Sequence, residues 1–178
     1  MTRNRRVPRV VRMIVAVLAL TMIGLAATSP DGPSKEVAPR PSAAEARERA
    51  RLLHDTIHDT LQLVHAQYYR EDEGLMIPAA SLKHVFQRIA DRNDIKLRWL
   101  VVDGRAMNID HNPKDEFETE AVKALASGKD EHEVTAHDIY RHAGAITLKA
   151  ECLKCHLPSR MSNKSRTAGL VISIPVAK

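Results

Sequence analysis

The sequence predicts an α+β domain built on an antiparallel sheet, on three observations. Residues 43–69 contain no Gly or Pro and repeat apolar residues at helical spacing. Residues 95–102 and 168–176 are apolar and partly alternating, which is typical of strands. The predicted order is helix, helix, strands, helix, strands, rather than the regular strand–helix alternation of a parallel sheet.

The first predicted helix, residues 43–69, begins with a capping box formed by Ser42 and Glu45. The apolar positions that recur along it are Leu53, Ile57, Leu61, Val64 and Tyr68. At 1.5 Å per residue such a helix is about 40 Å long, so we expect it to pack lengthwise on a sheet or to mediate a homodimer. A glycine and a proline separate it from a second, shorter helix over residues 81–93.

The remaining elements are predicted from turn residues and short apolar stretches. In order, they are a strand over 95–102, a hairpin turn at Asp103-Gly104, a returning strand over 106–109, a loop over 111–113, a helix over 115–126 that ends at Gly128, short strands over 137–142 and 145–148, and a last strand over 168–176. Pro175 is expected to place the end of the last strand at a sheet edge, because proline cannot donate a ladder hydrogen bond.

Residues 1–27 have the arrangement of an export signal. Five arginines before residue 13 precede an uncharged apolar run, residues 13–27, that ends in small residues. The run is shorter than the roughly 20 residues of a membrane span, so 1–27 is predicted to be a signal peptide or, if retained, a membrane anchor. Residues 28–42 hold four prolines and predict a linker. Residues 43–178 then form the exported, periplasmic domain.

The charge balance argues against a nucleic-acid partner. The net charge is +5, but five of the 27 basic residues lie in the leader. The remaining 22 match the 22 acidic residues of the chain. The domain therefore has no global excess of positive charge with which to bind a phosphate backbone.

The motif that carries chemistry is C-x-x-C-H, at Cys152, Cys155 and His156. Two thiols at this spacing can form thioethers with both vinyl groups of one porphyrin, and the adjacent histidine ligates the iron as proximal ligand. These are the only two cysteines of the chain, so one covalent haem c is predicted. The alternatives are a thioredoxin-like dithiol, which belongs near a βαβ pattern that is absent here, and a zinc site, which needs further ligands.

A distal iron ligand is predicted from the helices. His54, His58 and His65 form a stripe within roughly 40° on the first helix. The alternative is that they are ordinary half-exposed histidines. Further candidates for the distal ligand are His84, Met76 and Met107. The remaining histidines lie in polar stretches and are expected at the surface: His111, His132, His137 and His142. The basic run 160–166 follows the motif. Its residues Arg160, Lys164 and Arg166 could pair with haem propionates or with an anionic partner. The alternative is that this run is a solvated loop.

With these residues in hand, the domain resembles the PAS-like single-haem c-type cytochrome domains, a haem-binding family of unassigned function. The features that carry the resemblance are AECLKCHLP at 150–158, AGLVISIPV at 168–176 and RWLVVDGRAMNIDHNPKDEFE at 98–118. The resemblance covers residues 43–178 and implies a PAS-like antiparallel sheet with a long N-terminal helix and haem at the sheet edge. Some members of the family use a cysteine as distal ligand. This chain has no third cysteine, so a histidine is the implied substitute.

These features predict a c-type haem protein of the export compartment that acts in electron transfer or redox sensing. No output domain is present, so any signal must pass to a separate redox or signalling partner. The alternatives are a haem module that senses gases or small ligands, and a peroxidase-like enzyme. The enzyme would need acid and base groups on an open distal side, for which the sequence offers only scattered histidines.

Overall fold

The computed structural model describes residues 39–156 and 161–178. The predicted signal or anchor (1–27), most of the predicted linker (28–42) and Arg160 lie outside the described residues. Within the described part, no helix combines the length and the hydropathy that crossing a bilayer requires.

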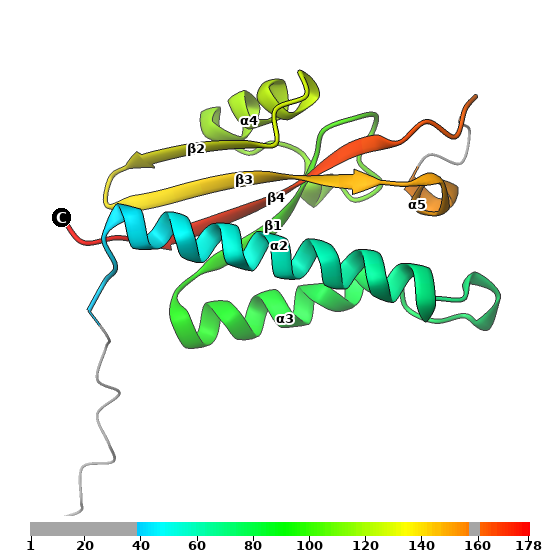
Figure 1. Ribbon diagram of the computed structural model, residues 1–178, viewed down its shortest axis with the longest axis horizontal. Coiled ribbons are helices and arrows are strands. Elements are labelled where there is room, and N and C mark those ends of the chain that lie inside the picture. Colours follow the sequence, from blue (N-terminus) through cyan, green and yellow to red (C-terminus); the bar gives the residue numbers. More distant parts are fainter. Residues whose placement is uncertain (1–38, 157–160) are drawn as a thin grey trace, which may run out of the picture. The chain divides into compact units, whose positions relative to one another are not determined.

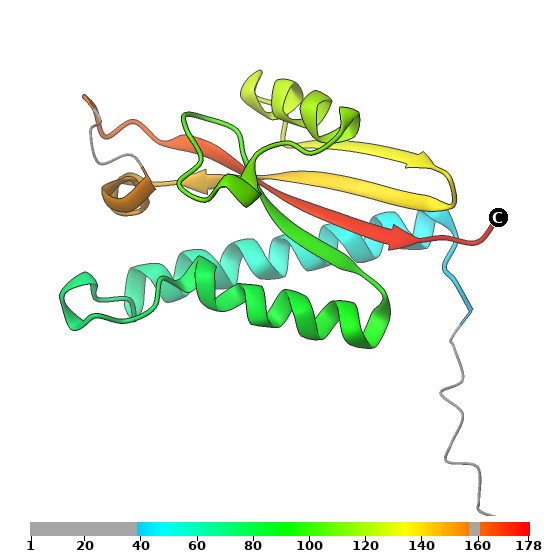
Figure 2. The ribbon, with the colours of Figure 1, turned by 180° about the vertical axis from the view of Figure 1, so that it is seen from behind.

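The described part folds into one antiparallel sheet with helices on both faces (Figures 1 and 2). The elements in order are α2 (Ala43–Gln67), η1 (Glu71–Glu73), α3 (Pro78–Asn93), β1 (Lys96–Val101), η2 (Ile109–His111), α4 (Glu116–Ala126), β2 (Glu131–Ala136), β3 (Ile139–Leu148), α5 (Ala150–His156) and β4 (Arg166–Pro175). The sheet order is β1-β4-β3-β2, with every neighbouring pair antiparallel. The helices α2 and α3 cover one face and α4 the other. The predicted α+β class with an antiparallel sheet is confirmed.

Helix α2 begins where the sequence predicts. The Ser42 side chain accepts a hydrogen bond from the backbone N–H of Glu45, and the Glu45 carboxylate accepts one from the backbone N–H of Ser42, so the predicted capping box is present. The buried side of the helix contacts β3 and β4 through Ala46, Ala50 and Ile57. Lengthwise packing on the sheet, the first of its two expected roles, is therefore what the structure shows.

The two faces of the sheet bury separate apolar clusters. On β3, Tyr140 and Ile146 belong to the cluster under α2 and α3, whereas Ala143 belongs to the cluster under α4. This alternation is the two-residue period of a strand. Helix α4 is capped by Asp115, and Gly128, with φ 92°, ends it as predicted.

The predicted hairpin at residues 103–109 is wrong. Strand β1 pairs with β4, from Lys96↔Ser173 to Val101↔Ala168. Asp103 prolongs that pairing, since its backbone N–H donates to the Thr167 carbonyl at 2.9 Å and its carboxylate accepts from the Thr167 N–H at 2.8 Å. The next residues leave the sheet and lead into η2.

The two short strands predicted over 137–142 and 145–148 also need correction. Strand β2 was not predicted, because it is an edge strand with one aliphatic residue larger than alanine, Val134. His137 and Asp138, with φ 52° and 59°, form the two-residue turn between β2 and β3. A single ten-residue strand then replaces the two short strands expected over 137–148. Pro175 lies on central strand β4 but beyond the end of β1, where β3 is its only strand neighbour.

Close packing of α2 on β3 depends on a missing side chain at Gly144. A Cβ at this position would overlap the imidazole of His54. We expect Gly144→Ala to lower the free energy of unfolding by about 1–2 kcal/mol, a typical cost of overpacking. Urea denaturation measures this change. Adding His54→Ala removes the overlapping ring, so the double variant should recover most of the loss; an equal or larger loss in the double variant would contradict the overlap.

Candidate functional site

The C-x-x-C-H motif lies on α5, the short helix that follows β3. Cys152 and His156 are four residues apart and therefore lie on the same side of this helix. The Cys152 thiol is buried against Leu148 and Leu153, and this burial raises its pKa. Cys155 belongs to the same helix. The helix thus brings a buried thiol and an imidazole to one end of the sheet.

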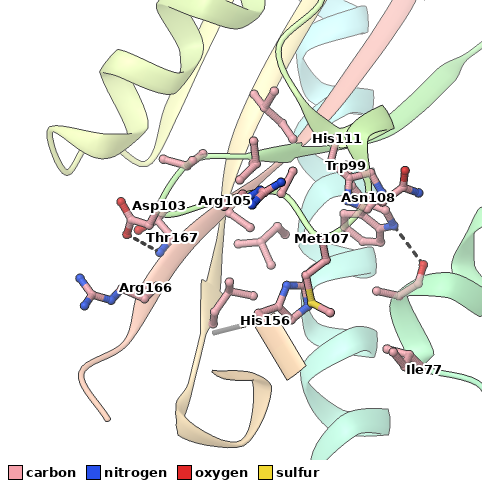
Figure 3. Close-up of a pocket in the computed structure, with 18 of the residues that line it drawn as sticks. Ile77, Trp99, Asp103, Arg105, Met107, Asn108, His111, His156, Arg166 and Thr167 are labelled. Carbon is pink, nitrogen blue, oxygen red and sulfur yellow. Dashed lines mark hydrogen bonds between the residues drawn. The ribbon is translucent and has the colours of Figure 1, made fainter. Parts of the chain in front are cut away.

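His156 lines a cavity of about 270 Å³ at that end of the sheet (Figure 3). The wall is mainly apolar and comes from α2, α3, β1, β3, β4, α5 and the loop after β1. Its apolar members are Leu61, Ile77, Ala79, Ala80, Trp99, Leu100, Val101, Val102, Ala106, Met107, Ile146, Leu148, Leu153 and Ala168. The Trp99 ring is fixed, since its Nε1–H donates to the Ala79 carbonyl at 3.0 Å. The cavity can therefore take a largely apolar molecule.

The charged groups around this cavity are mostly cationic. Lys83, Arg105 and Arg166 line it, and the Nε of Arg166 is buried without a hydrogen-bond partner among the residues that the structure describes. The carboxylate that lines it, Asp103, accepts the Thr167 N–H described above. Anionic substituents at the rim of a bound apolar molecule would be stabilised by these cations.

His111 was expected at the surface, and that expectation is wrong. It lies in η2 and lines the same cavity as His156. Figure 3 shows His111 near Trp99 and Asn108, apart from His156, with Met107 extending toward His156. The His111 Nε2 atom is buried and has no hydrogen-bond partner in residues 39–156 and 161–178. Burial, reinforced by Lys83 and Arg98, lowers the pKa of His111, which keeps the ring neutral.

The His111 segment is tied to the sheet by Arg98 of β1. The Arg98 guanidinium donates hydrogen bonds to the backbone carbonyls of Asp110 and Asn112, the latter at 3.0 Å. It also forms an ion pair with Glu118 of α4, whose carboxylate is 2% exposed. This ion pair anchors a turn whose own residues make few buried contacts.

Of the four helix histidines predicted as iron ligands, the structure brings only His65 to His156. Together with Cys152, the two rings border a second, much smaller cavity of about 30 Å³. The His65 Nδ1 is buried without a hydrogen-bond partner in the described part of the chain, and its ring lies 5.1 Å from that of Tyr69. Burial, with a further contribution from His65, lowers the pKa of His156.

The other predicted ligands lie elsewhere. His84 is exposed on α3 and Met76 is exposed before it, and neither lines a cavity with His156. His54 and His58 stack on each other at 5.9 Å, and His54 meets His142 of β3 edge-on at 5.6 Å. The helical stripe of three histidines therefore divides between two places.

His142 was expected at the surface but is 1% exposed, because β3 is central and this position faces α2. Of the other two histidines assigned to the surface, His137 is exposed as expected, and half-buried His132 packs on Phe117. For the zinc alternative, the described residues contain no group of three or more His, Cys, Asp or Glu side chains placed to hold a metal ion.

Burial of His142 predicts a loss of stability in acid. Burial, followed by the nearby His54, lowers the pKa of His142 to about 4. The unfolded chain binds a proton near pH 6.5 and the folded chain does not, so stability is full above about pH 6.5 and falls toward about pH 4. The expected loss between about pH 7 and pH 5 is about 2 kcal/mol, a figure that already includes the opposing effect of Glu131, 3.6 Å from the ring. Denaturant titrations at both pH values measure it.

The matched variant for this test is His142→Leu, which fills a similar space without a titrating group. It should remove most of the difference between the two pH values, whereas His84→Leu on the exposed side of α3 should leave the difference in place. A pH dependence that survives in His142→Leu would assign the effect to other groups, such as the Arg51–Glu131 ion pair.

Together, the fold and the cavity define an α+β domain that can enclose an apolar cofactor beside a helix-borne imidazole. The chain belongs to the Tll0287-like family, whose sequence profile matches residues 40–170. Its fold is similar to that in the crystal structure of the cyanobacterial heme-protein Tll0287, with a TM-score of 0.59 and 14% sequence identity over 75% of this chain and 97% of that chain. A comparison with curated proteins found no match.

Proposed function

We propose that this chain is a c-type haem protein in which Cys152 and Cys155 attach one haem covalently and His156 is its proximal iron ligand. The observation that carries this proposal is the position of His156, which the C-x-x-C-H helix places in the wall of the apolar cavity. Membership of the Tll0287-like family and the fold shared with a heme-protein support it.

The residues around the cavity fit haem in three respects. Burial lowers the pKa of His156, which favours the neutral imidazole that binds iron. The apolar wall suits the porphyrin ring, and the cations at the rim, Lys83, Arg105 and Arg166, suit its two propionates. Within the described residues, the Nε of Arg166 is a buried donor without an acceptor. Of the three residues of the basic run predicted to pair with propionates, the structure supports Arg166.

Bound haem supplies a one-electron iron couple and a coordination position for small ligands. The chain's own residues determine how that chemistry is used. Trp99, Leu148 and Leu153 give the cavity an apolar wall, and the cations that line it would offset the negative charge of the propionates. An apolar site with cations beside the propionates suits reversible electron transfer or redox sensing.

The proposal extends to the setting of the protein. We infer that the chain is exported, since haem c is attached in an export compartment, and that it exchanges electrons or signals with a separate protein. We assign the sheet, with its long N-terminal helix, to the PAS-like class that the sequence implies. The homodimer through the long helix remains a prediction.

A visible absorption spectrum of the mature protein, produced with a haem-c maturation system, tests the proposal. We expect a coloured protein whose pigment stays with the polypeptide in acid acetone and gives the pyridine haemochrome of a two-thioether haem. Colourless protein from a system that matures a control cytochrome, or pigment extracted by acid acetone, would contradict it.

The spectrum of the same matured protein also distinguishes electron transfer or redox sensing from the two alternative functions. A six-coordinate low-spin spectrum that does not respond to carbon monoxide or nitric oxide supports electron transfer or redox sensing. A spectrum that responds to either gas supports the ligand-sensing alternative, and turnover of hydrogen peroxide supports the peroxidase-like one.

A further inference from the structure

We propose that His111, on the turn η2, is the sixth ligand of the iron, opposite His156; this rests on the proposed haem. The inference replaces the histidine stripe of α2 with a residue of the loop after β1. It is carried by the shape of the cavity, by the state of the His111 ring and by the way its turn is anchored.

The available space favours His111 over His65. A porphyrin must lie between the two axial ligands, so the ligands have to face each other across an opening. The opening shared by His156 and His111 is about 270 Å³, whereas the one shared by His156 and His65 is about 30 Å³. The latter is about the space of a single water molecule. The space that His65 shares with His156 is therefore too small for a porphyrin.

The His111 ring has an unused nitrogen in this cavity. Its Nε2 atom is buried and makes no hydrogen bond within the described part of the chain. Buried polar atoms are nearly always paired in native proteins, so an unpaired nitrogen in a cavity wall indicates a missing partner. An iron atom bound between two imidazoles is a partner of the required kind.

Met107 also lines the cavity, but its attachment is looser. Its side chain is 67% exposed and lies on a loop segment between β1 and η2. His111 instead is the last residue of the capped turn η2, in which the Asn108 side chain accepts the Asp110 N–H at 2.9 Å. The carbonyls of Asp110 and Asn112, on either side of it, both accept from Arg98. Arg98 is thus a positioning residue that holds the His111 backbone on the sheet.

The test compares spectra of the matured full-length protein and single variants. The parent should be six-coordinate and low-spin, and His111→Ala should become high-spin while keeping its covalent haem. Added imidazole should restore the low-spin spectrum of His111→Ala. His111→Met should remain low-spin with a higher reduction potential, because a thioether raises the potential of haem iron. His84→Ala, on the exposed side of α3, is the control and should match the parent.

The outcomes separate this inference from the proposed function. A parent without covalent haem refutes the proposed function. A haem-loaded parent that is five-coordinate, or a His111→Ala variant that keeps the parent spectrum, overturns the role of His111 alone. Loss of the low-spin spectrum in His65→Ala or Met107→Ala, but not in His111→Ala, assigns the sixth position to that residue instead. Circular dichroism confirms that each variant is folded.

Discussion

Replacing both Cys152 and Cys155 with serine is expected to abolish covalent haem, so that acid acetone extracts all pigment from any protein that still binds it. A serine hydroxyl is not a thiolate nucleophile and forms no thioether with a vinyl group. Either single variant leaves one attachment point and should give a pyridine haemochrome shifted from the two-thioether position. Haemochrome spectra and the mass of the intact polypeptide measure both effects.

Lys154→Ala is the matched control for these variants, because it changes the motif between the cysteines and leaves both thiols in place. It should retain covalent haem with the parent haemochrome. Cys152 carries an additional structural role, since its side chain packs on Leu148 and Leu153. The isosteric change to serine therefore tests attachment with little loss of packing volume. Full retention of pigment in acid acetone by the double variant would contradict thioether attachment.

The sequence predicts the helices well because each is defined by its own residues. The capping box at Ser42, the apolar spacing along α2 and the glycine after α4 are local signals, and each is confirmed. Strand pairing is a property of distant residues. Asp103-Gly104 resembles a hairpin turn locally, but β1 finds its partner in β4, more than sixty residues later. Local turn propensity was overridden by tertiary packing.

In the candidate site, too, residues that are contiguous in sequence could be predicted and residues that depend on distant contacts could not. The motif that ends at His156 is contiguous and could be identified from sequence alone. His111 could not, because its sequence neighbours are polar or small and signal a surface loop. Its burial depends on Arg98 and on the end of the sheet, neither of which is adjacent in sequence. His142 also lies in a polar stretch of the sequence, which predicts the surface, and its burial follows from the central position of β3 in the sheet.

The buried carboxylate of Glu118 is expected to contribute more to stability than any other single charge on α4. Glu118 is 2% exposed. It accepts hydrogen bonds from Arg98, from Arg141 at 3.2 Å and from the Lys114 backbone N–H at 2.8 Å. Glu118→Ala leaves two guanidinium groups without this partner. Breaking a buried pair in this way typically costs 3–5 kcal/mol, and because both arginines are about a quarter exposed we expect about 3 kcal/mol.

Glu120→Ala is the control for this variant on the same helix. Glu120 pairs with Lys123 at the surface, where both groups are solvated, so no measurable change in the free energy of unfolding is expected. Urea denaturation of the two variants gives the comparison, and equal values would show that the Glu118 network is not stabilising. Glu118→Ala also frees Arg98, which holds the His111 turn. If His111 ligates iron, the haem-loaded variant should therefore show a larger high-spin fraction than Glu120→Ala, at a pH and temperature where both are folded.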